Sequence, residues 1–123
     1  MSNRRIAGDG ASVTDRPTVR YTGRRTEAGT EVVRHADDGS TSPLAWRLDL
    51  RNHSPTGFEW GYGGSGPAQL ALAILADTLG PEQAQGHYQD FKWKVIARLD
   101  KGDWEITREQ VQEWVSQRQE HGR

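Results

Sequence analysis

Several kinds of residue are missing from this chain of 123 residues, and each absence excludes a class of protein. There is no cysteine, so disulfides, cysteine-ligated metal centres and thiol catalysis are excluded. No apolar run approaches the roughly 18 residues that a membrane-spanning helix needs. The first residues contain no apolar stretch of the kind that a secretory signal requires. These absences predict a cytoplasmic protein that does not enter a membrane.

An excess of charge of either sign is also absent. The 16 basic and 17 acidic side chains leave a formal net charge of −1, which excludes a generally basic protein that coats nucleic acid. Leu, Ile, Val and Phe make up only 21 of the 123 residues, and five of these lie in residues 1–43. All five tryptophans come later in the chain. The core is therefore expected mainly from residues 44–115, with aromatic rings contributing much of the buried area.

The pattern of polar and apolar residues divides the chain into an arm, a β-rich part and a helical part. Residues 1–17 are polar and contain glycine, which predicts a disordered arm. Residues 18–120 are predicted to form a single domain. Alternation around a glycine-containing turn predicts a hairpin between residues 18 and 35. From residue 44 to 51 every second residue is apolar, and the residues between them are mostly charged, which predicts a third strand.

Three helices are predicted after these strands. The first covers residues 67–79 and is apolar on nearly all sides, which is typical of a buried central helix. The second covers residues 82–99. Alternation of apolar and charged residues over 91–95 is also compatible with a strand there. The third follows Thr107, which is expected to form a capping box with Gln110. The predicted class is therefore α+β, with a small antiparallel sheet of about three strands followed by three helices packed on its apolar face.

The most informative stretch runs from Gly61 to Pro67, within a glycine-rich connection over residues 52–66. Its glycines at 61, 63 and 66 match G-x-G-x-x-G and lead directly into a predicted helix. Glycine allows close backbone approach, and the first N–H groups of a helix have no partner within it. The stretch therefore predicts a site for a phosphate, nucleotide or carboxylate. The alternative is a loop whose glycines only allow the helix to pack against the sheet.

Two known nucleotide-binding patterns do not fit this stretch. A dinucleotide fold needs a preceding buried strand and a βαβ unit, which the sequence around Phe58 does not provide. A P-loop ends in G-K-[ST], which is absent here.

Side chains of the same connection are predicted to complete the site. The N–H groups of residues 63–66 are expected to take the negative charge, and Trp60 or Tyr62 to stack on a ring. Glu59 and Gln69 are expected to orient the ligand. The predicted ligand contacts are His53, Ser54, Thr56, Glu59, Trp60, Tyr62, Gly63, Gly64, Ser65, Gly66 and Gln69.

An enzymatic hypothesis remains open beside ligand binding. It uses His53 and Glu59 as base and acid and requires both side chains to reach one pocket. No residue is assigned as catalytic. The four histidines lack the spacing of a metal site, so neither a metal ion nor another cofactor is predicted. Ser65 is expected to cap the helix rather than act as a nucleophile.

Two further hypotheses concern macromolecular partners. A protein-interaction or regulatory role predicts an exposed apolar patch around Trp93, Trp104 or Trp114. Binding of nucleic acid would use arginines on the sheet. Residues 1–43 carry seven basic and six acidic side chains, however, so this alternative is not favoured. The arginines that it would use are Arg20, Arg24, Arg25, Arg47 and Arg51.

A long block of the sequence resembles a family. The block NHSPTGFEWGYGGSGPAQLALA, from Asn52 to Ala73, is similar to small uncharacterised proteins of bacteria, archaea and their mobile elements, classed as a domain of unknown function. The resemblance covers about residues 21–115. It includes YxGR from Tyr21, YQDFK from Tyr88 and WxIT from Trp104. It implies no particular chemistry and assigns no catalytic residue, although it makes an accessory protein of a mobile element one form of the protein-interaction hypothesis.

Overall fold

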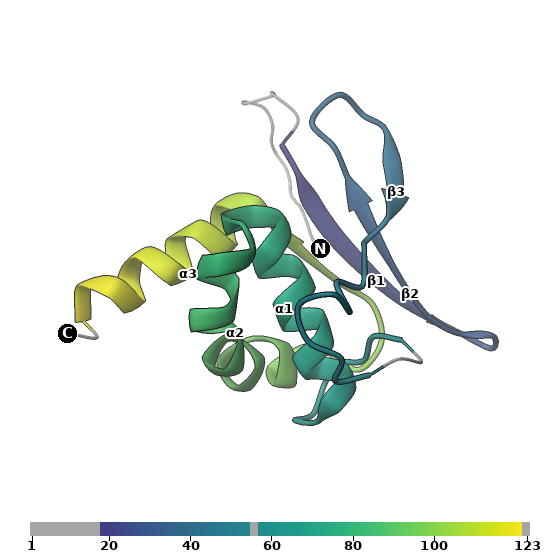
Figure 1. The fold of residues 1–123 in the computed structure, drawn as a ribbon. Helices are drawn as coiled ribbons and strands as arrows, with labels where there is room; N and C mark the ends of the chain where they lie inside the picture. Colours follow the sequence, from purple (N-terminus) through teal and green to yellow (C-terminus); the bar gives the residue numbers. More distant parts are fainter. Residues whose placement is uncertain (1–17, 55–56, 122–123) are drawn as a thin grey trace.

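The computed structural model describes residues 18–54 and 57–121. Within these residues the elements are β1 (Arg20–Thr26), β2 (Gly29–His35), β3 (Thr41–Pro43), α1 (Ser65–Leu79), α2 (Pro81–Lys94), the 3₁₀ helix η1 (Ile96–Arg98), β4 (Trp104–Thr107) and α3 (Arg108–His121) (Figure 1). The predicted arm, residues 1–17, and Thr56 lie outside the described residues. No helix in the described part of the chain is long and apolar enough to cross a membrane.

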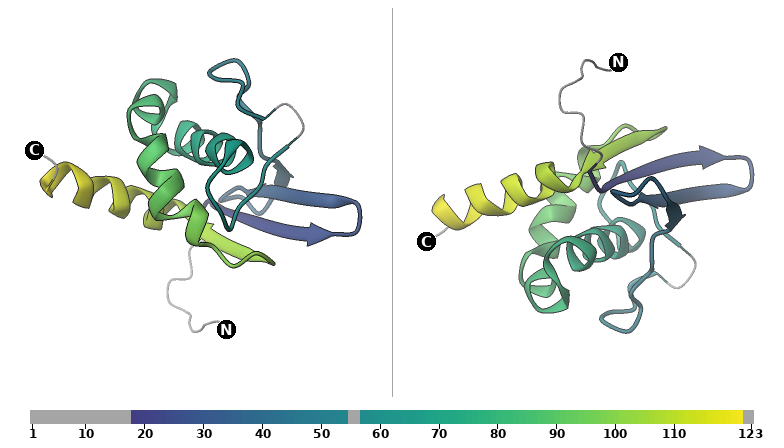
Figure 2. Two further views of the ribbon diagram at one scale, coloured as in Figure 1. Left: turned by 90° about the horizontal axis from the view of Figure 1, so that it is seen from below. Right: turned by 90° about the horizontal axis from the view of Figure 1, so that it is seen from above.

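The four strands form one antiparallel sheet in the order β3-β2-β1-β4. Tyr21 and Val32 point from one face of the sheet into the core and are buried. On the other face, the guanidinium of Arg24 lies 3.3 Å from the carboxylate of Glu31, and both side chains are exposed. The helices lie on the first face, so the sheet has one apolar and one charged face (Figures 1 and 2). This arrangement confirms the α+β class and the predicted hairpin.

Helix α1 forms the centre of the core, between the sheet and α2 (Figure 1). Its residues from Gly66 to Ala76 are all buried, as its apolar sequence predicts. Near its C-terminal end, Asp77 accepts hydrogen bonds from the Tyr21 hydroxyl at 2.6 Å and from Arg34 Nε at 2.8 Å. Burial and the hydrogen bond to Asp77 raise the pKa of Tyr21 to about 12, so the hydroxyl is a neutral donor near pH 7. These contacts fix this end of α1 on the sheet.

The predicted strand over residues 44–51 is wrong. The third strand is the short β3, and the chain after it is irregular. Arg47 has a φ of 59°, and the Leu50 N–H donates to the Arg47 carbonyl at 3.0 Å, so the backbone turns here. Leu44 is buried, but Trp46 and Leu48 are 39% and 36% exposed. The alternation of this segment therefore does not correspond to one buried face.

The sheet also contains a fourth strand that was not predicted. β4 pairs with residues 20–23 of β1 and lies between η1 and α3 in the chain, so the strands do not all precede the helices. Trp104 and Ile106 are buried while Glu105 is exposed, as alternation in a strand requires. The strand has only four residues and leads directly into α3, which leaves little periodic signal in the sequence.

The predicted helices are confirmed, with shifted ends. α1 begins at Ser65 with Gly64 in the cap position and no side-chain cap, so the expected serine cap is wrong. The second helix ends at Lys94 and is followed by η1, rather than continuing to residue 99. The capping box of α3 is present. The Thr107 hydroxyl accepts from Gln110 N–H at 3.1 Å, and the Gln110 side-chain oxygen accepts from Thr107 N–H at 2.9 Å.

Candidate functional site

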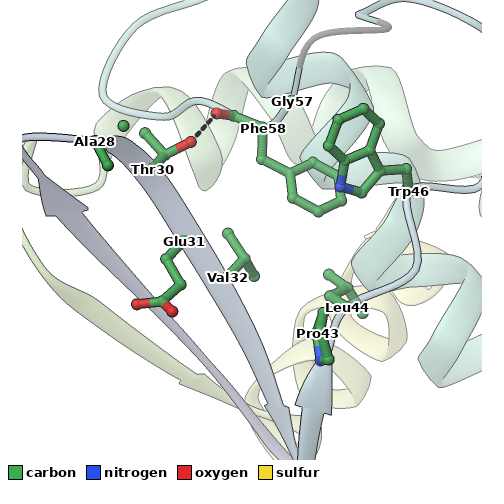
Figure 3. Close-up of a pocket in the computed structure, with 10 residues that line it drawn as sticks. Ala28, Thr30, Glu31, Val32, Pro43, Leu44, Trp46, Gly57 and Phe58 are labelled. Atoms are coloured by element: carbon green, nitrogen blue, oxygen red, sulfur yellow. Dashed lines mark hydrogen bonds between the residues drawn. The ribbon is translucent and has the colours of Figure 1, made fainter.

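Two adjoining pockets lie between β2 and the connection that joins β3 to α1. The larger, which we name the Ser65 pocket, has a volume of about 410 Å³. It is lined by Gly29, Thr30, Ser54, Gly57, Phe58, Glu59, Tyr62, Ser65 and Gly66. The other, the Trp46 pocket, has a volume of about 310 Å³ (Figure 3). It is lined by Ala28, Gly29, Thr30, Glu31, Val32, Pro43, Leu44, Trp46, Gly57 and Phe58.

Gln69 determines the path of the connection around these pockets. Its side chain is fully buried on α1. The side-chain oxygen accepts from the N–H groups of His53 at 2.8 Å and Ser54 at 3.2 Å. The side-chain nitrogen donates to the carbonyls of Trp46 at 2.8 Å and Arg51 at 3.0 Å. The two donor hydrogens are both used, so Gln69 positions the loop and has no N–H group left for a ligand.

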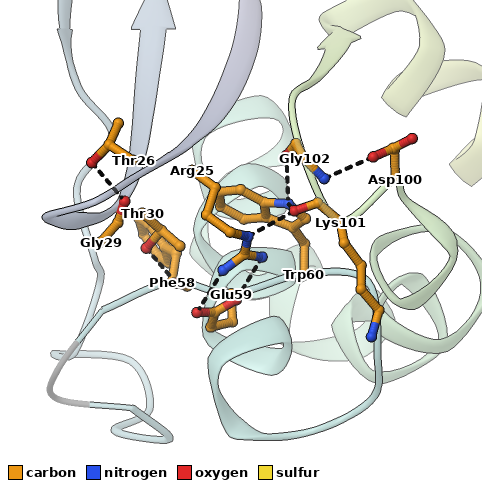
Figure 4. Close-up of polar contacts among 10 residues, drawn as sticks. All are labelled: Arg25, Thr26, Gly29, Thr30, Phe58, Glu59, Trp60, Asp100, Lys101 and Gly102. Carbon is orange, nitrogen blue, oxygen red and sulfur yellow. Dashed lines mark hydrogen bonds and ion pairs between the residues drawn. The ribbon is translucent and has the colours of Figure 1, made fainter.

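Trp60 is likewise part of the core. Its ring has no exposed surface, and its Nε1 donates to the carbonyl of Gly102 at 2.9 Å. The ring of Trp104 packs edge-on against it, with centroids 5.5 Å apart. The Arg25 guanidinium covers it 4.9 Å from the centroid (Figure 4). Stacking of Trp60 on a ligand would require the core to open, whereas Tyr62 is 47% exposed beside the Ser65 pocket.

Glu59 lines the Ser65 pocket but is paired with a cation. Its two carboxylate oxygens lie 3.1 Å and 2.9 Å from the terminal nitrogens of Arg25 (Figure 4). Arg25 Nε also donates to the Lys101 carbonyl at 2.7 Å. The hydrogen bond to Glu59 raises the pKa of Arg25, which stays fully charged. The ion pair ties the hairpin to the connection and reduces the negative potential beside the pocket.

The glycines of the connection allow side chains to pack closely against its backbone. A Cβ on Gly63 would collide with the ring of Trp93, and one on Gly64 would lie 2.9 Å from the ring of Tyr62. A Cβ on Gly66 would lie 2.7 Å from Cβ of Glu59. Part of the G-x-G-x-x-G pattern therefore serves packing, which was the alternative explanation of the sequence.

The start of α1 faces the Ser65 pocket. The helical hydrogen bonds begin with Ala68 N–H, which donates to the Gly64 carbonyl at 2.9 Å. The N–H groups of Ser65 and Gly66 thus have no partner within the helix, and Pro67 has no N–H. Both residues line the pocket, so the positive end of the helix dipole is directed toward it.

His53 and Glu59 do not meet in one pocket. His53 Nε2 is hydrogen-bonded to the Tyr88 hydroxyl at 2.8 Å, and the two rings pack 5.5 Å apart. Glu59 is held by Arg25 and lines the Ser65 pocket, whereas His53 lines neither of the two pockets. The geometry that the enzymatic hypothesis requires is therefore not present. Among the described residues, no group of three or more His, Asp or Glu side chains is arranged to hold a metal ion.

The arginines considered for nucleic-acid binding do not share one surface. Arg20 and Arg24 lie on the open face of the sheet, where each has a glutamate within 3.5 Å. Arg25 points to the opposite face, toward Glu59. Arg47 pairs with Asp49 at 3.0 Å in the loop after β3, and Arg51 is exposed in the same loop.

The structure adds residues that the sequence did not indicate as site residues. Thr30 and Phe58 line both pockets, and the Thr30 hydroxyl donates to the Phe58 carbonyl at 2.8 Å. Thr30, Val32 and Arg34 occupy every second position of β2 and share its inner face. This periodicity is visible in the sequence and could have indicated that Thr30 faces the core side of the sheet. No feature of the sequence predicts which residues of the connection lie next to β2.

Comparison with known proteins identifies a family but no function. A model described as "Family of unknown function (DUF6166)" matches residues 21–117. Neither the comparison with curated proteins nor that with solved structures gave a match.

Proposed function

The chain belongs to the DUF6166 family of unknown function, and we propose that it is a small binding domain whose ligand places an anionic group in the Ser65 pocket. The observation that carries this proposal is the position of the pocket at the start of α1. Ser65 and Gly66, whose N–H groups have no helical partners, both line it. A phosphate or carboxylate group is the complement of such a wall.

The other walls offer acceptors and an aromatic surface for the rest of the ligand. Thr30 and Ser54 add hydroxyl groups, although each already donates one hydrogen bond to a backbone carbonyl. Their oxygens can still accept a hydrogen bond from a ligand hydroxyl. The half-exposed ring of Tyr62 offers a surface for stacking. Glu59 does not oppose an anion with its full charge, because Arg25 neutralises it.

The proposal is tested by measuring anion binding to the full chain and to two variants. Inorganic phosphate, acetate and nucleoside monophosphates are titrated while amide NMR shifts and thermal unfolding are followed. At 100 times the Kd, a bound anion is expected to add about 2.7 kcal/mol to the free energy of unfolding. The amide signals of Ser65 and Gly66 are expected to show the largest changes in chemical shift.

Ser65→Glu provides the critical comparison. An acidic residue in the first turn is favourable for the helix, so the fold is expected to be retained while anion binding is lost. Ser65→Gln, which adds similar bulk without charge, is expected to bind more tightly than Ser65→Glu. The proposal fails if no anion shifts these amides, or if the two variants bind anions equally well.

A second candidate function is docking of a protein partner around Trp93. This ring is 55% exposed, and Lys92 Nζ lies 4.3 Å from its centroid. It packs against Gly63, and the exposed Tyr62 packs against the adjacent Gly64. Exposed Trp and Tyr are common among residues that dominate interface energies. Trp104 is buried and Trp114 is partly buried, so the predicted patch reduces to Trp93. Loss of a partner from Trp93→Ala but not from Ser65→Glu would favour this function.

A further inference from the structure

We infer that the ligand of the Ser65 pocket also carries an aromatic or branched apolar group, and that the Trp46 pocket accommodates it. This inference rests on the proposed function, because it assigns a second part of the same ligand. It names the ligand class as a flat or branched hydrocarbon group joined to a phosphate or carboxylate.

The walls of the Trp46 pocket are suited to such a group. Val32 and Leu44 form its base, and the rings of Phe58 and Trp46 lie over them (Figure 3). The two rings are 6.0 Å apart and tilted by 59°. Phe58 is buried, so the exposed ring of Trp46 is the surface on which an aromatic guest would pack. Trp46 is 39% exposed at the edge of this pocket, whose lining contains polar as well as apolar residues. A guest would cover apolar surface that now faces solvent.

The size of the pocket agrees with a ring system. A dry cavity of about 150 Å³ in another protein is sufficient for benzene. The Trp46 pocket, at about 310 Å³, has room for one ring with substituents or for two fused rings. Ligand sites generally occupy about 300–1,000 Å³, so the two pockets together are suitable for one small molecule.

The two pockets adjoin each other, which favours a single ligand over two separate ones. They share Gly29, Thr30, Gly57 and Phe58. The hydrogen bond from Thr30 to the Phe58 carbonyl holds β2 and the connection together at this boundary (Figure 3). A molecule that crosses the boundary would place its apolar group beside Trp46 and its anionic group beside Ser65.

One buried side chain holds a wall of each pocket. Gln69 binds the Trp46 carbonyl in the Trp46 pocket and the Ser54 N–H in the Ser65 pocket. The relative position of the two walls is therefore fixed before a ligand arrives, which lowers the entropy lost on binding. The carboxylates that border the pockets, Glu31 and Glu59, are paired with Arg24 and Arg25. A cationic ligand therefore has no free carboxylate partner at these two walls.

The test compares ligands that differ in one part. Inorganic phosphate, phenyl phosphate, 1-naphthyl phosphate and benzyl alcohol are titrated against the full chain by NMR. The aryl phosphates are expected to bind at least ten-fold more tightly than inorganic phosphate. Intermolecular NOEs are expected between their ring protons and the rings of Trp46 and Phe58 in the unmodified protein.

Variants separate the contributions of the two pockets. Trp46→Ala is expected to remove most of the ten-fold gain and to change the Kd for inorganic phosphate less than two-fold. Leu48→Ala, which removes an exposed apolar side chain that lines neither pocket, is the control and is expected to preserve the gain. The NOEs are measured without any substitution, so they decide the question even if Trp46→Ala proves unstable.

The outcomes distinguish this inference from the proposed function. Equal affinity for phenyl phosphate and inorganic phosphate, without NOEs to Trp46, overturns the inference and leaves the proposed function intact. Binding of benzyl alcohol as tight as that of phenyl phosphate, with no binding of inorganic phosphate, contradicts the anion site and with it the combined ligand. Absence of binding by every compound rejects both.

Discussion

Gln69 illustrates how a single residue can be recognised as important and still be given the wrong role. The sequence places a polar residue one turn into an apolar helix next to a glycine-rich loop, which points to a ligand contact. The structure directs its amide to four backbone groups of the preceding loop instead. A buried amide satisfies backbone groups of a loop as well as it satisfies a ligand, and sequence alone does not distinguish the two.

Replacement of Gln69 by Leu is expected to lower the free energy of unfolding by about 2–4 kcal/mol. The variant keeps the apolar bulk but leaves N–H and carbonyl groups near Trp46 and His53 without partners in the core, at about 1–3 kcal/mol for each group that water does not reach. Gln83→Leu, on the exposed side of α2, is the control and is expected to change stability by less than about 0.5 kcal/mol. Urea unfolding measures both. Equal stability of the two variants would contradict the role assigned to Gln69.

The aromatic residues of the connection were difficult to place for a related reason. Trp60 and Tyr62 are two residues apart in a segment without regular structure, so no periodicity separates the buried ring from the exposed one. The sequence predicted that either could stack on a ligand, and the structure leaves only Tyr62 accessible. The location of the candidate site was therefore predictable, because glycines and a helix start mark it. The exposure of each side chain depends on contacts with Lys101 and Gly102 that are distant in sequence.

At the scale of elements, the sequence was informative where a pattern extended over several turns or a complete hairpin. The β1–β2 hairpin and the three helices have such patterns and are confirmed. Alternation over residues 44–51 was misleading because a strand also needs a neighbour. Here β3 ends at Pro43, and the Trp46 carbonyl is satisfied by Gln69 instead of a strand. β4 was missed for the opposite reason. Pairing with β1 makes a strand of these four residues, which are too few to show a clear periodic pattern in the sequence.

The capping box of α3 gives a prediction at this scale. Thr107→Ala removes the hydroxyl that accepts from Gln110 N–H, and it is expected to lower the free energy of unfolding by about 1 kcal/mol. Gln112→Ala, at an exposed position of the same helix, serves as the control and is expected to have a smaller effect. Urea denaturation followed by circular dichroism gives both values. A change no larger than that of the control would show that the cap does not contribute to stability.

At the scale of the whole molecule, the contacts at the two ends of α1 have different consequences. The end near Asp77 is tied to the sheet by Tyr21 and Arg34. Among the described residues no hydrogen bond or ion pair ties the end near Ser65 to β2, and this end borders the larger pocket instead. Because α1 is fixed on the sheet at one end and buried along most of its length, the space beside its other end is held open by a rigid frame. A pocket in that position does not require a separate folding step to form.

We expect the attachment of α3 to α2 to depend on pH, and this gives a prediction for the stability of the whole molecule. Arg118 Nε donates to His87 Nδ1 at 2.8 Å, so this nitrogen of the imidazole must be unprotonated, and Arg118 also contacts Asp90. Burial and the nearby charge of Arg118 lower the pKa of His87, and burial also lowers the pKa of His35. In the unfolded chain both histidines take up a proton near pH 6.5. The unfolded state therefore binds more protons between pH 6.5 and the lower pKa of the folded state, and stability must rise with pH in that interval.

The free energy of unfolding is expected to be highest above pH 7 and to fall as the pH decreases through 6.5. Below the pKa values of the folded state these two histidines cause no further loss of stability. Urea unfolding at several values between pH 5 and 8 measures this dependence, and His87→Gln is expected to reduce its slope whatever its effect on stability at pH 8. An unchanged slope in His87→Gln would show that the Arg118–His87 contact does not couple folding to protonation.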